Sequence, residues 1–345
     1  MGLPKLTFFC ELDAEPLKAL VNKPMIRRLR ALHASLSLGI RDMSPERVEV
    51  VKNLNRAGIP VIAWLLLPVE DGYWFNLRNS PQALRQYVQF RDWTRANDLE
   101  WAGIGLDIEP DIQEAAELMK RNWRNWPRYL GRLFAAHEWK RGMTAYRELV
   151  SQIHSDGYRV DSYQMSMIAD ERLAGSTLIQ RLLGLVDVQV DREVLMLYTS
   201  FERPHGAGVL ASYASAARSI GLGSTGGGAD VEFGGPAPLS WDELARDLRL
   251  AFYFCDDIHI FSLEGCVQQG FLERLDGFIW DNPILLPEKS LLRVENKRRS
   301  LRSLLWVLSH SKAIFVTVAG GVLLWKGLTR WLKRYTRPAG QIVRD

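Results

Sequence analysis

The ten residues Trp101–Pro110, WAGIGLDIEP, carry the pattern that indicates the fold of this chain. Along a strand successive side chains point to opposite faces. One face here is aliphatic and the other small or acidic: Ile104, Leu106 and Ile108 against Gly103, Gly105, Asp107 and Glu109. In a closed parallel barrel, aliphatic side chains pack under outer helices, small residues leave room inside, and carboxylates lie at the C-terminal mouth. The stretch therefore predicts one strand of such a barrel.

Seven further strand-like runs alternate with helical segments along the chain. They are Lys5–Leu12, Ala34–Arg41, Ile59–Pro68, Tyr158–Met165, Val194–Ser200, Ser219–Thr225 and Ile258–Gly265. Eight strands alternating with helices predict an α/β fold, a (β/α)8 TIM barrel, and such a barrel takes about 250 residues. With 345 residues in the chain, we expect a barrel domain over residues 1–285 and a helical tail, hydrophobic and basic, over residues 286–345.

The charge of the chain is divided unevenly between these two parts. Residues 286–345 hold 13 Lys+Arg against 3 Asp+Glu, although the whole chain has a net charge of only +4. The barrel is therefore acidic, and we expect no nucleic acid among its partners. The three cysteines have no metal-ligand spacing and the N-terminus does not resemble a signal peptide, which favours a reducing, cytoplasmic location for the barrel. No histidine pair has metal-ligand spacing either, so we expect neither a metal nor another cofactor.

Two carboxylates at the end of the organising strand are the first candidates for catalysis. Asp107 and Glu109 share one face, with backbones about 6–7 Å apart along the strand. Two acids in a low-dielectric site do not both ionise readily, so one pKa should rise. A carboxylic acid with a raised pKa can protonate the oxygen of a leaving group. The alternative is that both acids are hydrogen-bonded or ion-paired at the barrel rim.

The run Gly103–Glu109, GIGLDIE, resembles the fourth-strand motif D-G-x-D-x-D-x-E of the chitinase-like glycoside hydrolases of family 18. Gly103, Asp107 and Glu109 fall on its glycine, its last aspartate and its catalytic glutamate. Ala102 and Gly105 stand where that family has its first two aspartates. The resemblance implies a TIM barrel that acts on a glycoside.

A second, weaker match lies on the sixth strand, where Met196–Tyr198 resembles that family's M-x-Y, although Thr199 replaces the usual next aspartate. The resemblance implies that Glu109 is the general acid/base and that Asp107 orients it or a substrate acetamido group. It also implies that the Tyr198 hydroxyl holds the reacting sugar. In such enzymes the acetamido oxygen of the substrate is the nucleophile.

The sequence also offers enzyme carboxylates for the second role. Glu264 shares a face with Ile258, Ile260 and Ser262 and ends the predicted eighth strand, and Glu11 has the equivalent place on the first. Either could be the nucleophile or base of a two-carboxylate glycosidase. A rim salt bridge of Glu264 with Arg41 is the alternative. A third possibility is a metal held by four acids, Glu11, Asp107, Glu109 and Glu264.

Aromatic residues near the third strand are candidates for substrate binding, because sugars stack on aromatic rings. They are Trp64 on the strand and Tyr73 and Trp74 in the following loop, Glu70–Asn76. The loop aromatics could instead form a plug over the barrel. We interpret the glycine-rich run Gly223–Gly228 as a flexible lid, and we place His259 on the face toward the helices.

The tail contains an uncharged run of 13 residues, Ala313–Trp325, flanked on both sides by Lys and Arg clusters. Crossing a bilayer takes roughly 20 apolar residues. Extending the run back to Leu304 gives 22 residues but includes Ser309, His310, Ser311 and Lys312. We expect the tail to associate with a membrane, as a spanning or as an interfacial helix. A soluble helix docked on the barrel or on a partner is the alternative.

Together these observations predict a glycoside-hydrolase-like barrel that acts on a carbohydrate or glycolipid near a membrane. The alternative is a non-catalytic barrel that binds a carbohydrate or a lipid headgroup and serves as a membrane-tethered scaffold.

Overall fold

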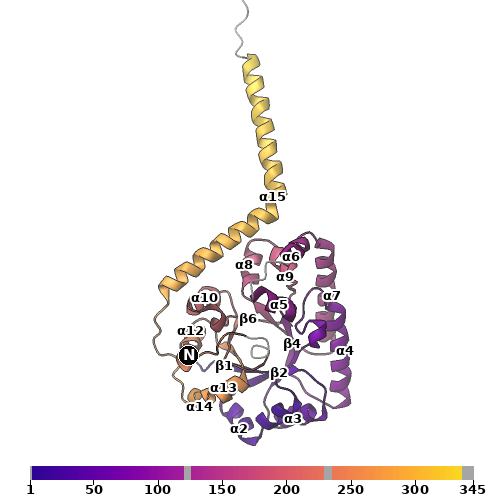
Figure 1. Ribbon diagram of the computed structural model, residues 1–345, viewed down its shortest axis with the longest axis vertical. Coiled ribbons are helices and arrows are strands. Elements are labelled where there is room, and N and C mark those ends of the chain that lie inside the picture. The colour runs from indigo at the N-terminus through magenta and orange to yellow at the C-terminus, as the bar shows by residue number, and fades with distance from the viewer. Residues whose placement is uncertain (1, 120–125, 229–234, 336–345) are drawn as a thin grey trace, which may run out of the picture.

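In the computed structural model, eight parallel strands close into a barrel in sequence order, so the predicted (β/α)8 TIM barrel is confirmed (Figure 1). The structure describes residues 2–119, 126–228 and 235–335. The strands are β1 (Lys5–Cys10), β2 (Ser35–Ile40), β3 (Val61–Leu65), β4 (Gly103–Ile108), β5 (Val160–Met165), β6 (Arg192–Met196), β7 (Ser219–Gly223) and β8 (Asp257–Phe261). Each strand has fewer residues than its predicted run, and β6 and β8 also begin before their predicted runs, at Arg192 and Asp257.

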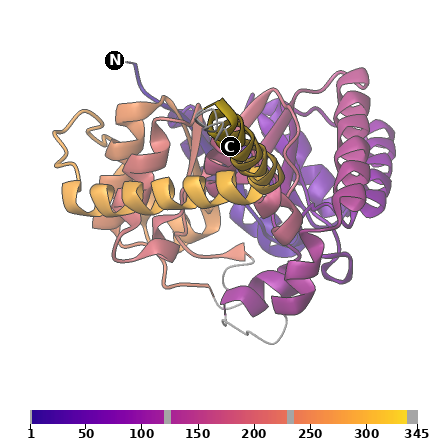
Figure 2. The same cartoon turned by 90° about the horizontal axis from the view of Figure 1, so that it is seen from above.

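The helices form a ring outside the strands, as Figure 2 shows from the side of the barrel. Before β5 they are α1 (Ala14–Leu20), α2 (Lys23–Ala31), α3 (Pro45–Arg56), η1 (Val69–Asp71), α4 (Ser80–Ala96), α5 (Ile112–Met119), α6 (Trp126–Arg132) and α7 (Ala136–Ser155). After β5 they are α8 (Met167–Leu173), α9 (Leu178–Leu183), η3 (Thr199–Glu202), α10 (Gly206–Ala214), α12 (Trp241–Phe254), α13 (Leu263–Gln268), α14 (Phe271–Leu275) and α15 (Glu288–Tyr335). Local caps start two of them: the Ser44 hydroxyl accepts from Arg47 N, and Ser240 and Glu243 form a reciprocal capping box.

The alternation read from β4 is confirmed. Ile104, Leu106 and Ile108 lie in the large core between strands and helices. On the inner face, Gly105 is paired in register with Trp64 of β3. A Cβ at Gly105 would overlap the Tyr163 hydroxyl, which contacts Ser37 Oγ at 2.6 Å. The glycine is therefore needed because the Tyr163 side chain fills the barrel at this level.

The inner and outer faces of β8 are the reverse of the prediction. Ile258 and Ile260 lie in the outer core, whereas Phe261 belongs to the inner aromatic cluster. His259, which we placed toward the helices, is fully buried inside the barrel, with its ring centroid 5.7 Å from that of Phe9.

The reason is that β8 ends at Phe261 rather than continuing to residue 265. The Ser262 side chain accepts a hydrogen bond from Gly265 N and so starts helix α13. Glu264 therefore reaches the barrel mouth from the first turn of a helix, and the strand alternation used to place it does not apply.

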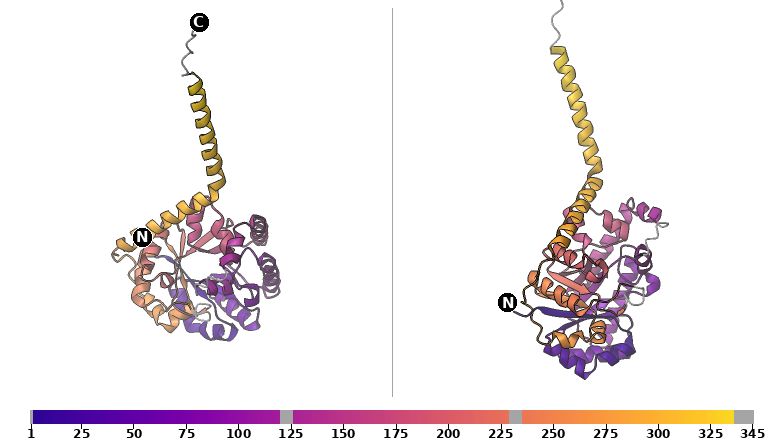
Figure 3. Two further views of the ribbon diagram at one scale, coloured as in Figure 1. Left: turned by 45° about the horizontal axis from the view of Figure 1, so that its top comes forward. Right: turned by 60° about the vertical axis from the view of Figure 1, so that its left-hand side comes forward.

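The first part of α15 packs across the outside of α8 and α10, and its later part projects away from the barrel (Figures 1 and 3). Val294 and Leu305 are buried against the barrel. Within the described ranges no helix combines the length and apolar character needed to cross a bilayer. The spanning form of the predicted tail is thus not found there, and membrane association, like the division between residues 285 and 286, stays a prediction.

Candidate active site

The structure brings all the predicted site residues together at the C-terminal end of the strands. A cavity of about 30 Å³ there is lined by Phe9, Glu11, Trp64, Trp74, Asp107, Glu109, Tyr163, Met196, Tyr198 and Phe261. The two remaining candidates, Tyr73 and Glu264, both hydrogen-bond to Glu11. These residues come from β1, β3, β4, β5, β6 and β8 and from the segments that follow β1, β3, β4, β6 and β8, which meet only in a closed barrel.

Asp107 is the most deeply buried acid of β4, with 3% of its surface exposed. Its Oδ2 accepts a hydrogen bond of 3.1 Å from the Trp64 indole, and its Oδ1 is buried without a hydrogen-bond partner among the described residues. Burial, the charge of Glu109 and the charge of Glu11 raise the pKa of Asp107 well above its ordinary value, whereas the Trp64 hydrogen bond lowers it. The predicted rise in pKa thus falls on Asp107.

Glu11 links the first strand to two other parts of the mouth. The Tyr73 hydroxyl donates to Glu11 Oε1, and the Glu11 backbone N–H donates to Glu264 Oε1 at 3.2 Å. Tyr73 has a φ of 64°, in a region uncommon for residues other than glycine. The turn is held because Phe75 N donates to the Asp107 carbonyl oxygen at 2.8 Å. The loop after β3 is therefore anchored to β4 and directs Tyr73 onto Glu11.

Glu264 is a second acid with a perturbed pKa. Its Oε2 is buried and has no hydrogen-bond partner within the described part of the chain. Burial raises the pKa of Glu264 to about 6, against hydrogen bonds from the backbone of Glu264 and Glu11 and from Cys10 that lower it. Burial, and next the charge of Glu264, raise the pKa of the Cys10 thiol. The partner we considered for a rim salt bridge, Arg41, pairs with Asp13 (Nε–Oδ1 3.0 Å).

The glycines after β7 close over these two acids. Gly226, Gly227 and Gly228 have φ values of 102°, 94° and 60°, which favour glycine. A Cβ at Gly227 would lie 2.5 Å from Glu264 Cγ, and one at Gly228 would overlap Glu11 Oε2. The sequence predicted a lid here. The described part of the run is packed against the carboxylates, and residues 229–234 lie outside the described ranges.

Three aromatic residues that sequence reasoning missed complete the lining. Phe9, Tyr163 and Phe261 point inward from β1, β5 and β8, and Phe261 stacks on Tyr198 with ring centroids 5.8 Å apart. Strand alternation could have identified Phe9 and Tyr163. Phe9 lies two residues before Glu11, and Tyr163 pairs in register with Asp107. For Phe261 the signal was misread, because the predicted β8 extended past its end.

The cavity itself has room for about one water molecule, whose share of liquid volume is near 30 Å³. A sugar ring can therefore enter only if Trp74, a half-buried aromatic of the lining, or its neighbours move. As for the metal alternative, no cluster of three or more His, Cys, Asp or Glu in the described ranges has the arrangement of a metal site.

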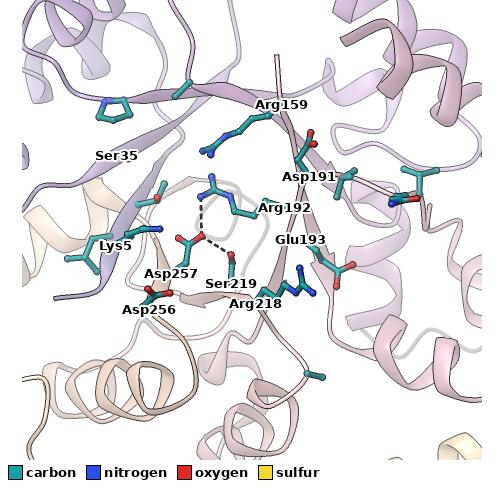
Figure 4. Close-up of a pocket in the computed structure, with 18 of the residues that line it drawn as sticks. Lys5, Ser35, Arg159, Asp191, Arg192, Glu193, Arg218, Ser219, Asp256 and Asp257 are labelled. Atoms are coloured by element: carbon teal, nitrogen blue, oxygen red, sulfur yellow. Dashed lines mark hydrogen bonds and ion pairs between the residues drawn. The ribbon is translucent and has the colours of Figure 1, made fainter. Parts of the chain in front are cut away.

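A larger cavity, about 1060 Å³, opens at the opposite, N-terminal end of the barrel (Figure 4). At its floor, Arg192 Nη1 donates to Asp257 Oδ2 at 3.1 Å, and Arg192 Nη2 contacts the fully buried Asp161. Ser219 Oγ donates to Asp257 Oδ2 at 2.8 Å. Burial alone would raise the pKa of Asp257, but the His259 imidazole and the Arg192 guanidinium hold it below its ordinary value.

Comparison with known proteins adds similarities of fold. No protein-family model matches the chain, and no curated protein matches it significantly. Among solved structures, the chain is similar to a GH18 chitinase from Pseudoalteromonas aurantia (11% identity, TM-score 0.48, 80% of this chain and 100% of that one). It is also similar to the PgaB (BpsB) glycoside hydrolase domain from Bordetella bronchiseptica (11%, 0.49, 82% and 100%). A D-psicose 3-epimerase from Clostridium cellulolyticum H10 matches as well (12%, 0.40, 88% and 99%).

Proposed function

We propose that the barrel is a glycoside hydrolase in which Glu109 is the general acid/base and Asp107 its partner. The observation that carries the proposal is the setting of Asp107: buried, next to Glu109 and Glu11, with a raised pKa, at the end of a TIM barrel where chemistry takes place. A protonated Asp107 can donate a hydrogen bond to Glu109 or to the substrate, which a second carboxylate anion cannot.

The roles of the other residues follow from where they lie. Glu109 is half-buried in the cavity lining, so it can exchange a proton with a bound glycoside. Tyr198, Trp64 and Trp74 offer the hydroxyl and ring surfaces that sugars contact. Glu264 is the candidate for a second enzyme carboxylate, and the acetamido oxygen of a substrate is the other nucleophile to consider.

The absence of two motif aspartates, where Ala102 and Gly105 stand, favours the second candidate function, a non-catalytic barrel that binds a carbohydrate or a lipid headgroup. A volume of about 30 Å³ does not admit a sugar ring, so binding at the mouth would start with displacement of the loop aromatics. For either function we propose a carbohydrate or glycolipid ligand and a membrane partner bound through the tail, because of the uncharged run 313–325 between basic clusters.

The test is hydrolysis of a panel of glycosides, including N-acetylglucosaminides, by the full chain and four variants. Glu109→Gln should lower turnover of an unactivated glycoside by roughly two to four orders of magnitude, the usual contribution of acid–base catalysis. Asp107→Asn should also lower it and move the pH–rate profile. Glu264→Gln separates the mechanisms, because a large loss supports two enzyme carboxylates and a small one supports the acetamido route. Glu148→Gln, an exposed acid on α7, is the control. Glycosides that bind but are never cleaved by the unsubstituted chain would refute catalysis.

A further inference from the structure

The side of α15 that faces solvent changes character at Leu304. Before it, the exposed residues are mostly charged or polar; after it, apolar side chains dominate. Leu304, Trp306, Val307 and Leu308 are 55%, 50%, 48% and 53% exposed, and Leu173 at the end of α8 is 67% exposed beside them. These five residues are here called the flank patch. Three of them, Leu173, Trp306 and Val307, line a hollow of about 290 Å³ together with Ala174, Arg302 and Ser303.

The flank patch is held rigidly to the barrel. Arg298 Nη2 lies 3.0 Å from Asp170 Oδ1, its Nη1 donates to Ser212 Oγ at 2.9 Å, and its guanidinium lies 3.6 Å above the Tyr213 ring. Asp170 is fully buried. On the next turns Leu305 is buried, and His310 approaches Gly175 to within 3.9 Å of its Cβ position. This part of α15 is therefore a fixed piece of the barrel wall with an apolar outer side.

Basic residues precede the flank patch along α15. Residues 288–311 contain six Lys and Arg against two Glu, and Arg299 is exposed one turn before Leu304. Trp306 adds an aromatic with a polar N–H, the side chain that is enriched where apolar and aqueous phases meet. Apolar residues with basic residues next to them on the same helix match a surface that is apolar inside and anionic outside.

We infer that the flank patch seats the barrel directly on an anionic lipid surface, with Trp306 in the headgroup region. A second copy of the chain is disfavoured as the occupant, because two copies joined through this face would bring their basic residues together. The chain also continues from the patch into the uncharged run 313–325. The inference deepens the proposed membrane association of the tail and rests on it.

Seating on the flank has a consequence for the proposed site. α15 crosses α8 and α10, which run along the wall of the barrel, so a surface that touches α15 lies alongside the barrel axis (Figure 2). The mouth then opens along the membrane surface, neither covered by it nor pointing away from it. A ligand attached to a headgroup can reach the mouth in this arrangement.

The experiment uses the full chain with vesicles of phosphatidylcholine alone or mixed with phosphatidylglycerol. The chain has 12 tryptophans, so the Trp306 signal is taken as the difference between the chain and Trp306→Phe. On the mixed vesicles, brominated acyl chains should quench most of this difference signal, and acrylamide in the water should lose access to it. Arg299→Gln should weaken partitioning roughly fivefold, the usual contribution of one basic residue near an anionic surface. Arg85→Gln, an exposed arginine on α4, should leave it unchanged.

Two results would overturn the inference, and they are distinguishable. If the chain binds the mixed vesicles while Trp306 stays open to acrylamide and untouched by brominated lipid, the tail alone is the anchor. If the chain binds neither vesicle, the membrane association of the tail fails as well. Neither outcome bears on glycoside hydrolysis, which is measured without vesicles.

Discussion

At the N-terminal end of the barrel two aspartates, one fully and one partly buried, share one arginine, whereas at the C-terminal end buried acids are gathered around Asp107. Asp161 and Asp257 both contact Arg192. At the mouth, no ion pair to Asp107 or Glu264 is found among the described residues. The pKa of Asp257 is accordingly lowered, and those of Asp107 and Glu264 are raised.

The difference shows that burial of an acid does not identify its role; the nearby charge does. A buried acid with a cation stays ionised and links strands, because removing one partner would leave an uncompensated charge. A buried acid without a cation keeps its proton to higher pH, which is the property of a general acid or of its neutral partner. On this basis the N-terminal cluster is structural and the mouth is the candidate for chemistry.

The largest effect is expected when Arg192, the arginine shared by Asp161 and Asp257, is removed. Arg192→Met should lower the free energy of unfolding by about 3–5 kcal/mol, because the fully buried Asp161 loses its nearest cation and the partly buried Asp257 loses one of its partners. Urea unfolding at neutral pH measures this. A loss below about 1 kcal/mol at neutral pH would mean that the ion pairs of Arg192 contribute no more to stability than exposed surface ion pairs do.

At the mouth we expect a substitution that stabilises the chain. The pKa of Glu264 is raised from 4.5 to about 6 in the folded chain, so the unfolded chain loses this proton first as the pH rises. Glu264 therefore reduces stability as the pH passes from about 4.5 to 6, by on the order of 2 kcal/mol. Glu264→Gln should stabilise the chain at pH 7 by up to that amount and flatten this part of the stability curve. A destabilised variant at pH 7 would contradict the raised pKa.

The smallest expected effect is on the hydrogen bond to Asp107. Trp64→Phe keeps an aromatic ring but removes the indole N–H that donates to Asp107 Oδ2. Since this bond lowers the pKa of Asp107, its loss should raise that pKa further. Carboxyl carbon NMR titration follows Asp107 directly. An unchanged or lower pKa would mean that the indole is not a partner of the ionised form.

The sequence could predict the features of the barrel and of the site that depend on residues close together along the chain. In β4 six residues alternate without interruption, so the inward side of Asp107 and the need for Gly105 could be read directly. In β8 the same rule failed for Glu264, because Ser262 starts a helix; the polar cap residue after Phe261 was the signal. A helix cap two residues before a candidate acid outweighs the strand alternation before it.

Contacts between distant segments could not be predicted at all. Arg298 and Asp170 are 128 residues apart, and nothing in the sequence around either residue indicates the other. The opposite pKa shifts of Asp257 and Asp107 also depend on which strand brings Arg192 close. Register around the closed barrel decides this, and alternation within one strand carries no information about it.

The contact of Arg298 with Asp170 also determines how force passes between the tail and the barrel. A flexible linker would absorb a pull on the C-terminus by extending. Here α15 is continuous from the barrel wall to Tyr335, and Arg298 is bound to an aspartate buried under α15. A pull on the tail would therefore act first on α8 and α10, the helices that follow β5 and β6 and that contact α15.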